Sequence, residues 1–161
     1  MKLVPLTALA LLAAPVALAQ EINVSLSDDF QTKLTDDYGT REGDYLSKEV
    51  KEDLMRELTK AGVDIARVDV TILDARPSKP TFKELGDKPG LDYGASRSTG
   101  GMKLSAVAYD ADNKKTGEYE YSWYETDIRM TGLTTWYDAN KASSRFARNF
   151  AEDLKEGDLS N

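Results

Sequence analysis

Two short segments alternate apolar and polar side chains with a period of two, which is typical of half-buried β-strands. They are residues 22–26 and 67–73, and the second is rich in β-branched side chains. Between them an apolar stripe recurs about every four residues, as in an amphipathic helix. It is formed by Leu46, Val50, Leu54, Leu58 and Ala61. We therefore predict a strand, a helix and a strand, and a right-handed crossover would make the two strands parallel.

Capping residues set the expected limits of the helices in this half of the chain. Ser27 is expected to cap a short helix or turn that carries Leu34. We predict a loop over the polar residues 35–43 and a cap at Asp44 for the long helix. Gly62 is expected to end that helix in the left-handed conformation.

The residue pattern in the second half of the chain predicts a β-hairpin. Residues 102–109 and 118–125 read as strands, and the polar residues 110–117 between them read as the turn. On the second arm one face carries Tyr119, Tyr121 and Trp123. The opposite face carries Glu118, Glu120, Ser122 and Tyr124, and Tyr124 is the better candidate for an exposed contact. The aromatic face is expected to pack into the core, with an exposed platform for glycans or peptide side chains as the alternative.

A final helix is expected to begin at Thr135, which lies three residues before Asp138 in a pattern similar to a capping box, and to end at Gly157. Its apolar positions are Trp136, Ala139, Ala142 or Ser143, Phe146, Phe150 and Leu154. The predicted fold class is α+β, in the order β-α-β, long loop, β-β-α. We expect a mixed, mostly antiparallel sheet of about four strands with two main helices packed on one face.

Residues 1–19 have the features of a secretory signal peptide, with a basic Lys2, an apolar stretch and a small-x-small cleavage site ending at Ala19. We expect cleavage after Ala19, a single domain over 20–161, no transmembrane anchor after cleavage, and a periplasmic or secreted product. Lys2 leaves with the signal, so the mature chain carries 20 basic and 28 acidic side chains and a net charge of −8. This charge disfavours binding to nucleic acid.

The chain contains no cysteine and no histidine. Disulfides, thiol nucleophiles, the usual structural zinc sites and Ser-His-Asp catalysis are therefore excluded. We expect no cofactor and no bound metal, and we assign no catalytic residue. The turn around Asp110 and Asp112 superficially resembles a calcium loop, but it lacks the glycine and the distant glutamate of the helical motif and reads as a hairpin turn.

Residues 74–101 do not fit the regular pattern. They contain all three prolines of the mature chain and five of the eleven glycines. Loops of this length are usually functional or disordered. Apolar residues are spaced through this one, so we expect it to be held against a surface. The apolar residues are Phe82, Leu85, Leu91 and Tyr93.

Arg76, Lys79 and Lys83 form a positive cluster at the start of this loop. Such a cluster favours a site for an anion or a partner carboxylate, with hydroxyls and backbone amides as further donors. A solvated loop in which the prolines limit the entropy of the unfolded chain is the alternative. The candidate binding residues are Arg76, Ser78, Lys79, Thr81, Lys83, Tyr93, Arg97 and Tyr124.

Several stretches of the mature chain together carry a resemblance to a family. They are residues 76–85, 89–91, 100–101, 135–139, 146–147 and Leu154. In these stretches the chain resembles an uncharacterised family of small exported bacterial envelope proteins. The resemblance implies an envelope location and a small α+β domain, and it implies no reaction and no catalytic residues.

The last helix also carries a basic stripe of Lys141, Arg145 and Arg148, which is expected to be solvated and to pair with Asp138 and Glu152. The sequence favours an exported, non-enzymatic binding or envelope-accessory protein whose partner is an envelope protein or another envelope component. One alternative is a small carboxylate-based hydrolase of envelope polymers, for which Asp28, Asp29, Glu118 and Glu120 are candidates. Another is an inhibitor that uses the 74–101 loop. The sequence leaves the oligomeric state open.

Overall fold

The computed structural model describes residues 21–159, so the predicted signal peptide and its cleavage site lie outside the described residues. The elements are β1 (Glu21–Leu26), α1 (Asp28–Lys33), the π-helix η1 (Leu34–Tyr38), α2 (Thr40–Ala61), β2 (Arg67–Arg76), α3 (Phe82–Asp87), β3 (Gly101–Tyr109), β4 (Lys115–Tyr124) and α4 (Tyr137–Glu156). Within residues 21–159, no helix is both long and apolar enough to cross a membrane.

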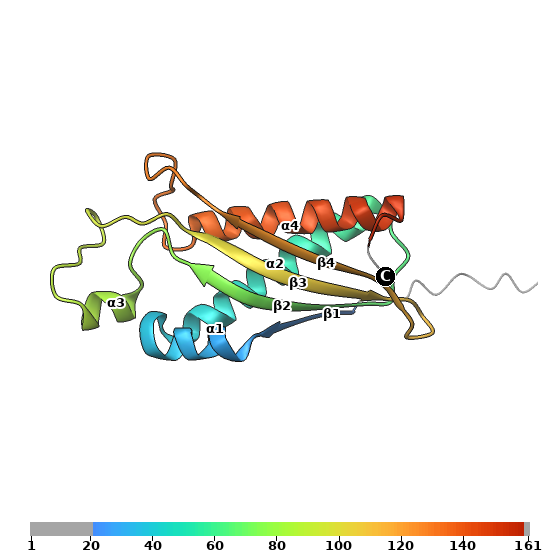
Figure 1. Cartoon of the computed structure of the whole chain (residues 1–161), viewed down its shortest axis with the longest axis horizontal. Helices are drawn as coiled ribbons and strands as arrows, with labels where there is room; N and C mark the ends of the chain where they lie inside the picture. The colour runs from blue at the N-terminus through green and yellow to red at the C-terminus, as the bar shows by residue number, and fades with distance from the viewer. Residues whose placement is uncertain (1–20, 160–161) are drawn as a thin grey trace, which may run out of the picture.

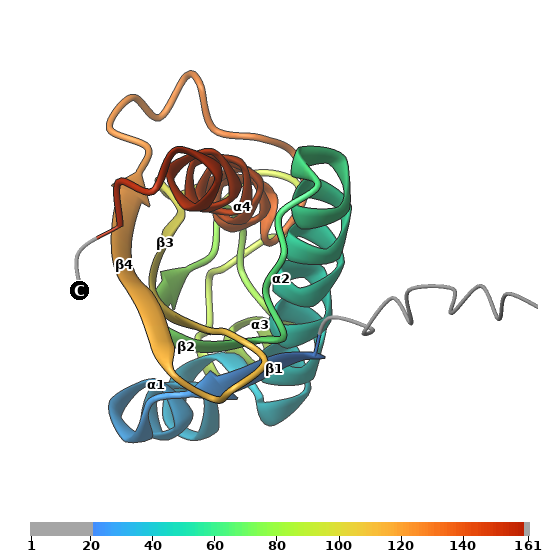
Figure 2. The same ribbon diagram turned by 90° about the vertical axis from the view of Figure 1, so that its right-hand side faces the viewer.

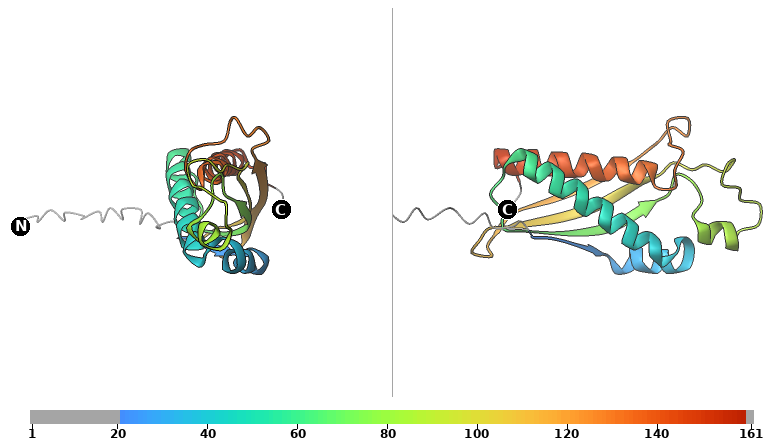
Figure 3. Two further views of the ribbon diagram at one scale, coloured as in Figure 1. Left: turned by 90° about the vertical axis from the view of Figure 1, so that its left-hand side faces the viewer. Right: turned by 180° about the vertical axis from the view of Figure 1, so that it is seen from behind.

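The four strands form one sheet in the order β1-β2-β3-β4 (Figure 1). β1 is parallel to β2, whereas β2 with β3 and β3 with β4 are antiparallel. The long helices α2 and α4 lie on the same side of the sheet (Figures 2 and 3). The predicted α+β fold class is therefore confirmed, as is the parallel pairing through a helical crossover.

The core lies between this sheet face and the two long helices. Leu104 and Ala106 of β3 are fully buried on it. Beside them, Tyr119 and Tyr121 of β4 pack against Phe146 of α4, with ring centroids 5.8 and 6.3 Å apart. The aromatic face of β4 is therefore part of the core, as expected, because its rings pack against the apolar side chains of α4.

A β-bulge changes the orientation of residues near the end of β2. The register with β3 shifts between Ile72 and Asp74, so one residue has no partner of its own. Since side chains alternate along a strand, the bulge turns Ala75 into the core and leaves Asp74 on the opposite face. β2 extends to Arg76, three residues beyond the predicted strand.

The predicted loop over residues 35–43 is wrong. Residues 34–38 form the π-helix η1, which follows α1 directly and ends before Gly39. Leu34 and Tyr38 are buried one turn apart on it. Gly39 has φ of 103°, and this left-handed backbone separates η1 from α2. α2 then begins at Thr40, so Asp44 lies inside the helix and is not its cap. The predicted stop at Gly62 is confirmed, with φ of 68°.

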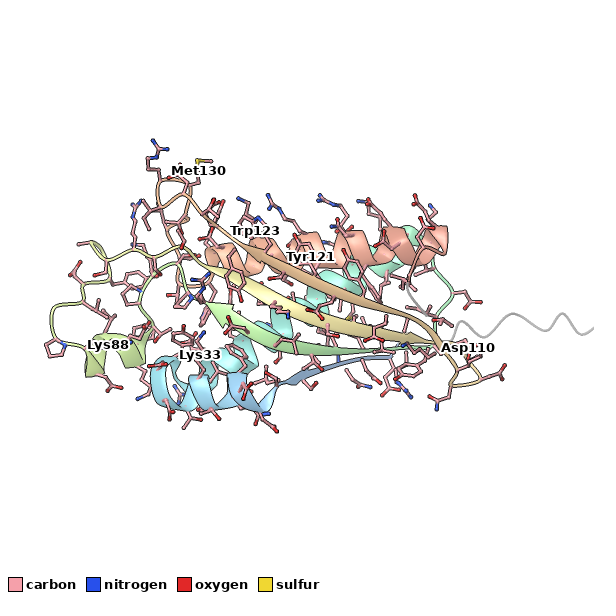
Figure 4. All side chains as sticks on the ribbon, in the orientation of Figure 1. Lys33, Lys88, Asp110, Tyr121, Trp123 and Met130 are labelled. Carbon is pink, nitrogen blue, oxygen red and sulfur yellow. The ribbon has the colours of Figure 1, made fainter. Side chains whose placement is uncertain are left out.

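The hairpin turn is shorter than predicted, since β4 begins at Lys115. Oδ1 of Asp110 accepts hydrogen bonds from the backbone N–H groups of Asp112 and Lys114, and Asn113 has φ of 60°. These features confirm a turn built on the Asp110 side chain. Figure 4 shows Asp110 at one end of the molecule and Lys88, the C-cap of α3, at the other.

Candidate functional site

The two long connections of the second half meet at one end of the sheet, where β2 and β4 end and α4 begins (Figure 1). We call this region the loop end; it consists of residues 77–100 and 125–136. Ser78 joins its parts through backbone hydrogen bonds. Its N–H donates to the carbonyl of Thr135 at 2.6 Å, and its carbonyl accepts from the N–H of Ser98 at 3.0 Å.

Asp138 is the polar centre beneath these loops and is fully buried. Its Oδ2 accepts from the Ser78 hydroxyl at 2.8 Å and from the Gly100 N–H at 3.1 Å, and the Thr131 hydroxyl lies at 2.5 Å. In return, the Asp138 N–H donates to Oγ of Ser78 at 3.1 Å. α4 begins at Tyr137, and its N-cap residue Trp136 makes no side-chain capping bond, so the capping-box start predicted at Thr135 is wrong. Ser78, from a distant segment, supplies the cap, and the carboxylate lies at the positive end of α4.

Lys79 is also buried, with 5% of its surface exposed. Its Nζ donates to the carbonyl oxygen of Tyr93 at 2.8 Å and lies 4.9 Å from the centre of the Tyr93 ring. Thr81 is buried as the N-cap of α3, where it forms a capping box with Glu84. Ser78, Lys79 and Thr81 thus hold the 74–101 loop in place, and whether they bind a ligand stays a prediction.

The predicted positive cluster is divided by the fold. Lys79 points to backbone carbonyls, and Nζ of Lys83 pairs with Asp87 at 2.5 Å. Arg76, by contrast, has no ion pair among the described residues and lies with its guanidinium 4.3 Å from the centre of the Tyr124 ring. The three side chains are near one another in the sequence, but Arg76 lies at the end of β2 and Lys83 in α3, which begins at Phe82.

The first depression at the loop end is a cavity of about 280 Å³, which we call the aromatic pocket. It is lined by Glu42, Tyr45, Pro80, Phe82, Tyr93, Thr134, Thr135 and Trp136. Phe82 is 86% exposed, and Tyr45 and Tyr93 are 40% and 44% exposed. The buried Trp136 donates from Nε1 to Glu42 at 2.5 Å, which fixes its ring in the wall.

The second depression has a volume of about 310 Å³, and we call it the arginine groove. It is lined by Tyr38, Arg76, Pro77, Pro80, Glu84, Leu91, Ser96, Arg97, Ser98 and Thr99. Arg97 makes no ion pair or hydrogen bond among the described residues. Pro80 lines both depressions, so the groove and the aromatic pocket are neighbours.

A hydrogen-bonded chain supports Arg76 from below. The Tyr124 hydroxyl donates to Oδ2 of Asp74 at 2.7 Å, and Nζ of Lys33 pairs with Oδ1 at 2.7 Å. Burial and the hydrogen bond to Asp74 raise the pKa of Tyr124 well above its usual range. Burial is the largest single effect and lowers the pKa of Lys33, but the hydrogen bonds and charge interactions with Asp74 and Tyr38 together outweigh it, so the pKa of this amine is raised. Tyr124 is therefore a neutral, half-buried support and not the exposed contact expected from its face of the strand.

Sequence reasoning missed Tyr45 and Glu42, which reach the aromatic pocket from α2. No signal in the sequence singles them out, because only the packing of α2 beside the loop end brings them there.

The basic stripe of α4 does not pair with Asp138 as predicted, because Asp138 is buried beneath the loops. Lys141 pairs instead with Glu125 at 3.6 Å, and the Arg145 guanidinium lies 4.4 Å from the centre of the Trp123 ring.

The acids proposed for hydrolysis do not converge on these depressions. On β4, Glu118 pairs with Lys115 of the same strand and Glu120 with Lys103 of β3, both at 2.6 Å, and Asp28 and Asp29 lie in α1. Each depression has a single carboxylate in its lining, Glu42 or Glu84. Over residues 21–159 there is no group of three or more acidic side chains placed to hold a metal ion.

Comparisons with known proteins give a structural likeness but no family. No protein-family model matches the chain, and no curated protein matches its sequence. The chain is similar to a crystal structure of a minor lipoprotein from Acinetobacter baumannii, with a TM-score of 0.39 and 11% sequence identity over 86% of this chain and 94% of the other.

Proposed function

We propose that the protein is an exported, non-enzymatic binding protein whose loop end docks an envelope polypeptide. The aromatic pocket carries this proposal, because Phe82 is 86% exposed beside a cavity with a buried Trp136 in its wall. Aromatic anchors beside well-formed pockets are the usual centres of protein interfaces. Export is the expectation from the signal-like residues 1–19.

Further apolar side chains are exposed on the neighbouring connection between β4 and α4. Ile128, Met130 and Leu133 are 45%, 63% and 64% exposed. Figure 4 shows Met130 on the loop that projects from the same end of the molecule as Lys88. A concentration of exposed apolar side chains at one end favours an interaction surface over scattered surface residues.

A polypeptide suits this pocket better than a sugar. Sugar sites combine an aromatic face with several free polar groups, whereas the carboxylate of Glu42 is already engaged by Trp136, and the hydroxyl of Tyr45 accepts from Asn140 at 2.7 Å. The rest of the lining is Pro80, the rings of Phe82, Tyr93 and Trp136, and two threonines, of which Thr135 donates its hydroxyl hydrogen to the Tyr93 hydroxyl at 3.5 Å. Such a wall accepts an apolar or aromatic side chain.

The test uses point substitutions, because replacing residues 76–85 would remove the buried Ser78, Lys79 and Thr81 and disturb the fold. A library of displayed peptides is selected on the immobilised protein over 20–161. The enriched peptides are then measured against Phe82→Ser and against Met55→Ser, a control whose side chain is 52% exposed on α2. We expect Phe82→Ser to weaken binding at least about tenfold and the control to bind as the wild type does. Enrichment of no peptide, or equal binding by Phe82→Ser, would contradict the proposal.

A further inference from the structure

We infer that the arginine groove binds a carboxylate group of the docked polypeptide, immediately beside the side chain held in the aromatic pocket. The inference rests on the proposed function and adds the chemistry of the partner: an extended segment with an acidic group next to an apolar side chain. The two depressions are adjacent, because Pro80 lines both of them. A segment that crosses Pro80 would present neighbouring groups to the two sites.

The charges of the groove favour an anion. Arg76 and Arg97 both line it, and neither has an ion pair among the described residues. Glu84, the acid in the lining, is already committed, since it accepts from the Thr81 N–H at 3.1 Å and pairs with Lys88 at 3.1 Å. In an acidic protein, two arginines that lie in one depression without an ion pair to residues 21–159 are available to an anionic ligand.

The balance of charge favours a carboxylate over a phosphate. The side chains that line the groove carry two guanidinium groups and the carboxylate of Glu84, which Lys88 pairs from outside the lining. A monoanion is repelled less by this carboxylate than a phosphate dianion would be. The planar guanidinium fork also matches the two oxygens of a carboxylate.

Arg76 is held in position before any ligand arrives. Its guanidinium lies 4.3 Å from the centre of the Tyr124 ring, and the Tyr124 hydroxyl is fixed on Asp74 at 2.7 Å. Lys33 holds the other oxygen of Asp74 at 2.7 Å, so this carboxylate is occupied and does not capture Arg76. A side chain that is already ordered loses less conformational entropy on binding. Tyr38 and Leu91 add apolar wall on which the stem of an acidic side chain can lie.

The inference can be tested by titrating ¹⁵N-labelled protein over 20–161 with three probes. The first is a blocked peptide containing tryptophan followed by glutamate, the second has glutamine in place of glutamate, and the third is inorganic phosphate. Shifts are followed at the backbone amides of Ser98 and Thr99 and at the Arg97 side chain, which belong to the groove. The same titrations are repeated with Arg97→Gln and with Arg148→Gln, a control that lies on the exposed face of α4 outside both depressions.

We expect the glutamate peptide to shift the groove signals and to bind at least about tenfold more tightly than the glutamine peptide. Arg97→Gln should abolish that preference, and Arg148→Gln should keep it. Equal binding of the two peptides, or no groove shift with the glutamate peptide, overturns the carboxylate site. Stronger binding of phosphate than of the glutamate peptide also overturns it. If Phe82→Ser still weakens both peptides in those cases, the proposed function stands without the carboxylate.

Discussion

The hydroxyl of Ser78 lies 2.8 Å from the carboxylate of Asp138, a residue sixty positions later in the chain. This bond fastens the 74–101 loop to the first turn of α4, and Asp138 also accepts from the Gly100 N–H where β3 begins. The surface of the loop end therefore depends on a buried polar junction. The residues proposed for binding on that surface are expected to keep their positions only while the junction is intact.

Replacing Asp138 with alanine should destabilise the protein by roughly 2–4 kcal/mol, because Ser78 and Gly100 would lose their buried acceptor. The measurement is urea unfolding followed by circular dichroism. Ser122→Ala is the control, since Ser122 is exposed on β4 and its loss should change stability by less than about 0.5 kcal/mol. Equal midpoints for the two variants would show that the junction contributes no stability.

A second polar junction joins the two long helices. Oδ2 of Asp53 accepts from Ser143 at 2.7 Å and from Ser144 at 3.0 Å. We expect Asp53→Ala to lower the free energy of unfolding by about 1–3 kcal/mol, because Ser143 is fully buried and would be left without an acceptor. The matched control is Glu52→Ala, whose exposed partner Lys48 lies 3.7 Å away and whose loss should cost about 0.5 kcal/mol or less. A larger effect in the control would contradict this.

Two glycines of the 74–101 region should respond in opposite directions to alanine. A Cβ at Gly101 would overlap the backbone of Trp123 and Tyr124 on β4, so Gly101→Ala should cost about 3 kcal/mol or more. Gly86 lies inside α3 with open space around it, so Gly86→Ala should stabilise the protein by up to about 1 kcal/mol. Thermal unfolding compares the two variants, and a loss of stability in both would contradict the packing described for α3.

Alkaline pH should destabilise the protein through its buried tyrosines. Burial raises the pKa of Tyr124 and of Tyr38 above the ordinary value of about 10. The neutral phenol is favoured in the folded protein, so this stabilisation is complete below pH 10 and is lost as the pH rises through the folded pKa. Urea unfolding between pH 8 and 11.5 should therefore show falling stability above about pH 10. Tyr124→Phe should make the fall shallower, and an unchanged slope would argue against its buried phenol.

The fold could be predicted in large part from the sequence, because its elements have strong local patterns. The alternation in β1 and β2, the four-residue stripe of α2 and the glycine stop at Gly62 all depend on short-range geometry. Boundaries failed where a distant contact decided them. Tyr38 is helical because it packs against Trp136, with ring centroids 5.7 Å apart, and no local signal predicts that contact.

The candidate site divides in the same way. The sequence alone identified the unusual 74–101 segment, and it included Arg76, Tyr93 and Arg97 among the candidate binding residues. It could not separate Lys79 from Arg76, since both are basic and three positions apart. Tertiary packing separates them, because it buries Lys79 against backbone carbonyls and leaves Arg76 over the Tyr124 ring.

The sequence by itself thus predicted the four strands and the two long helices but neither η1 nor α3, and it determined the absence of cysteine and histidine chemistry and the segment proposed for binding. Only the tertiary structure decided which side chains are free. The bulge in β2 places Asp74 under Tyr124, and the start of α4 turns Asp138 inward beneath Ser78. Both outcomes depend on hydrogen bonds between residues at least fifty positions apart, and buried polar groups must find such partners wherever the fold brings them.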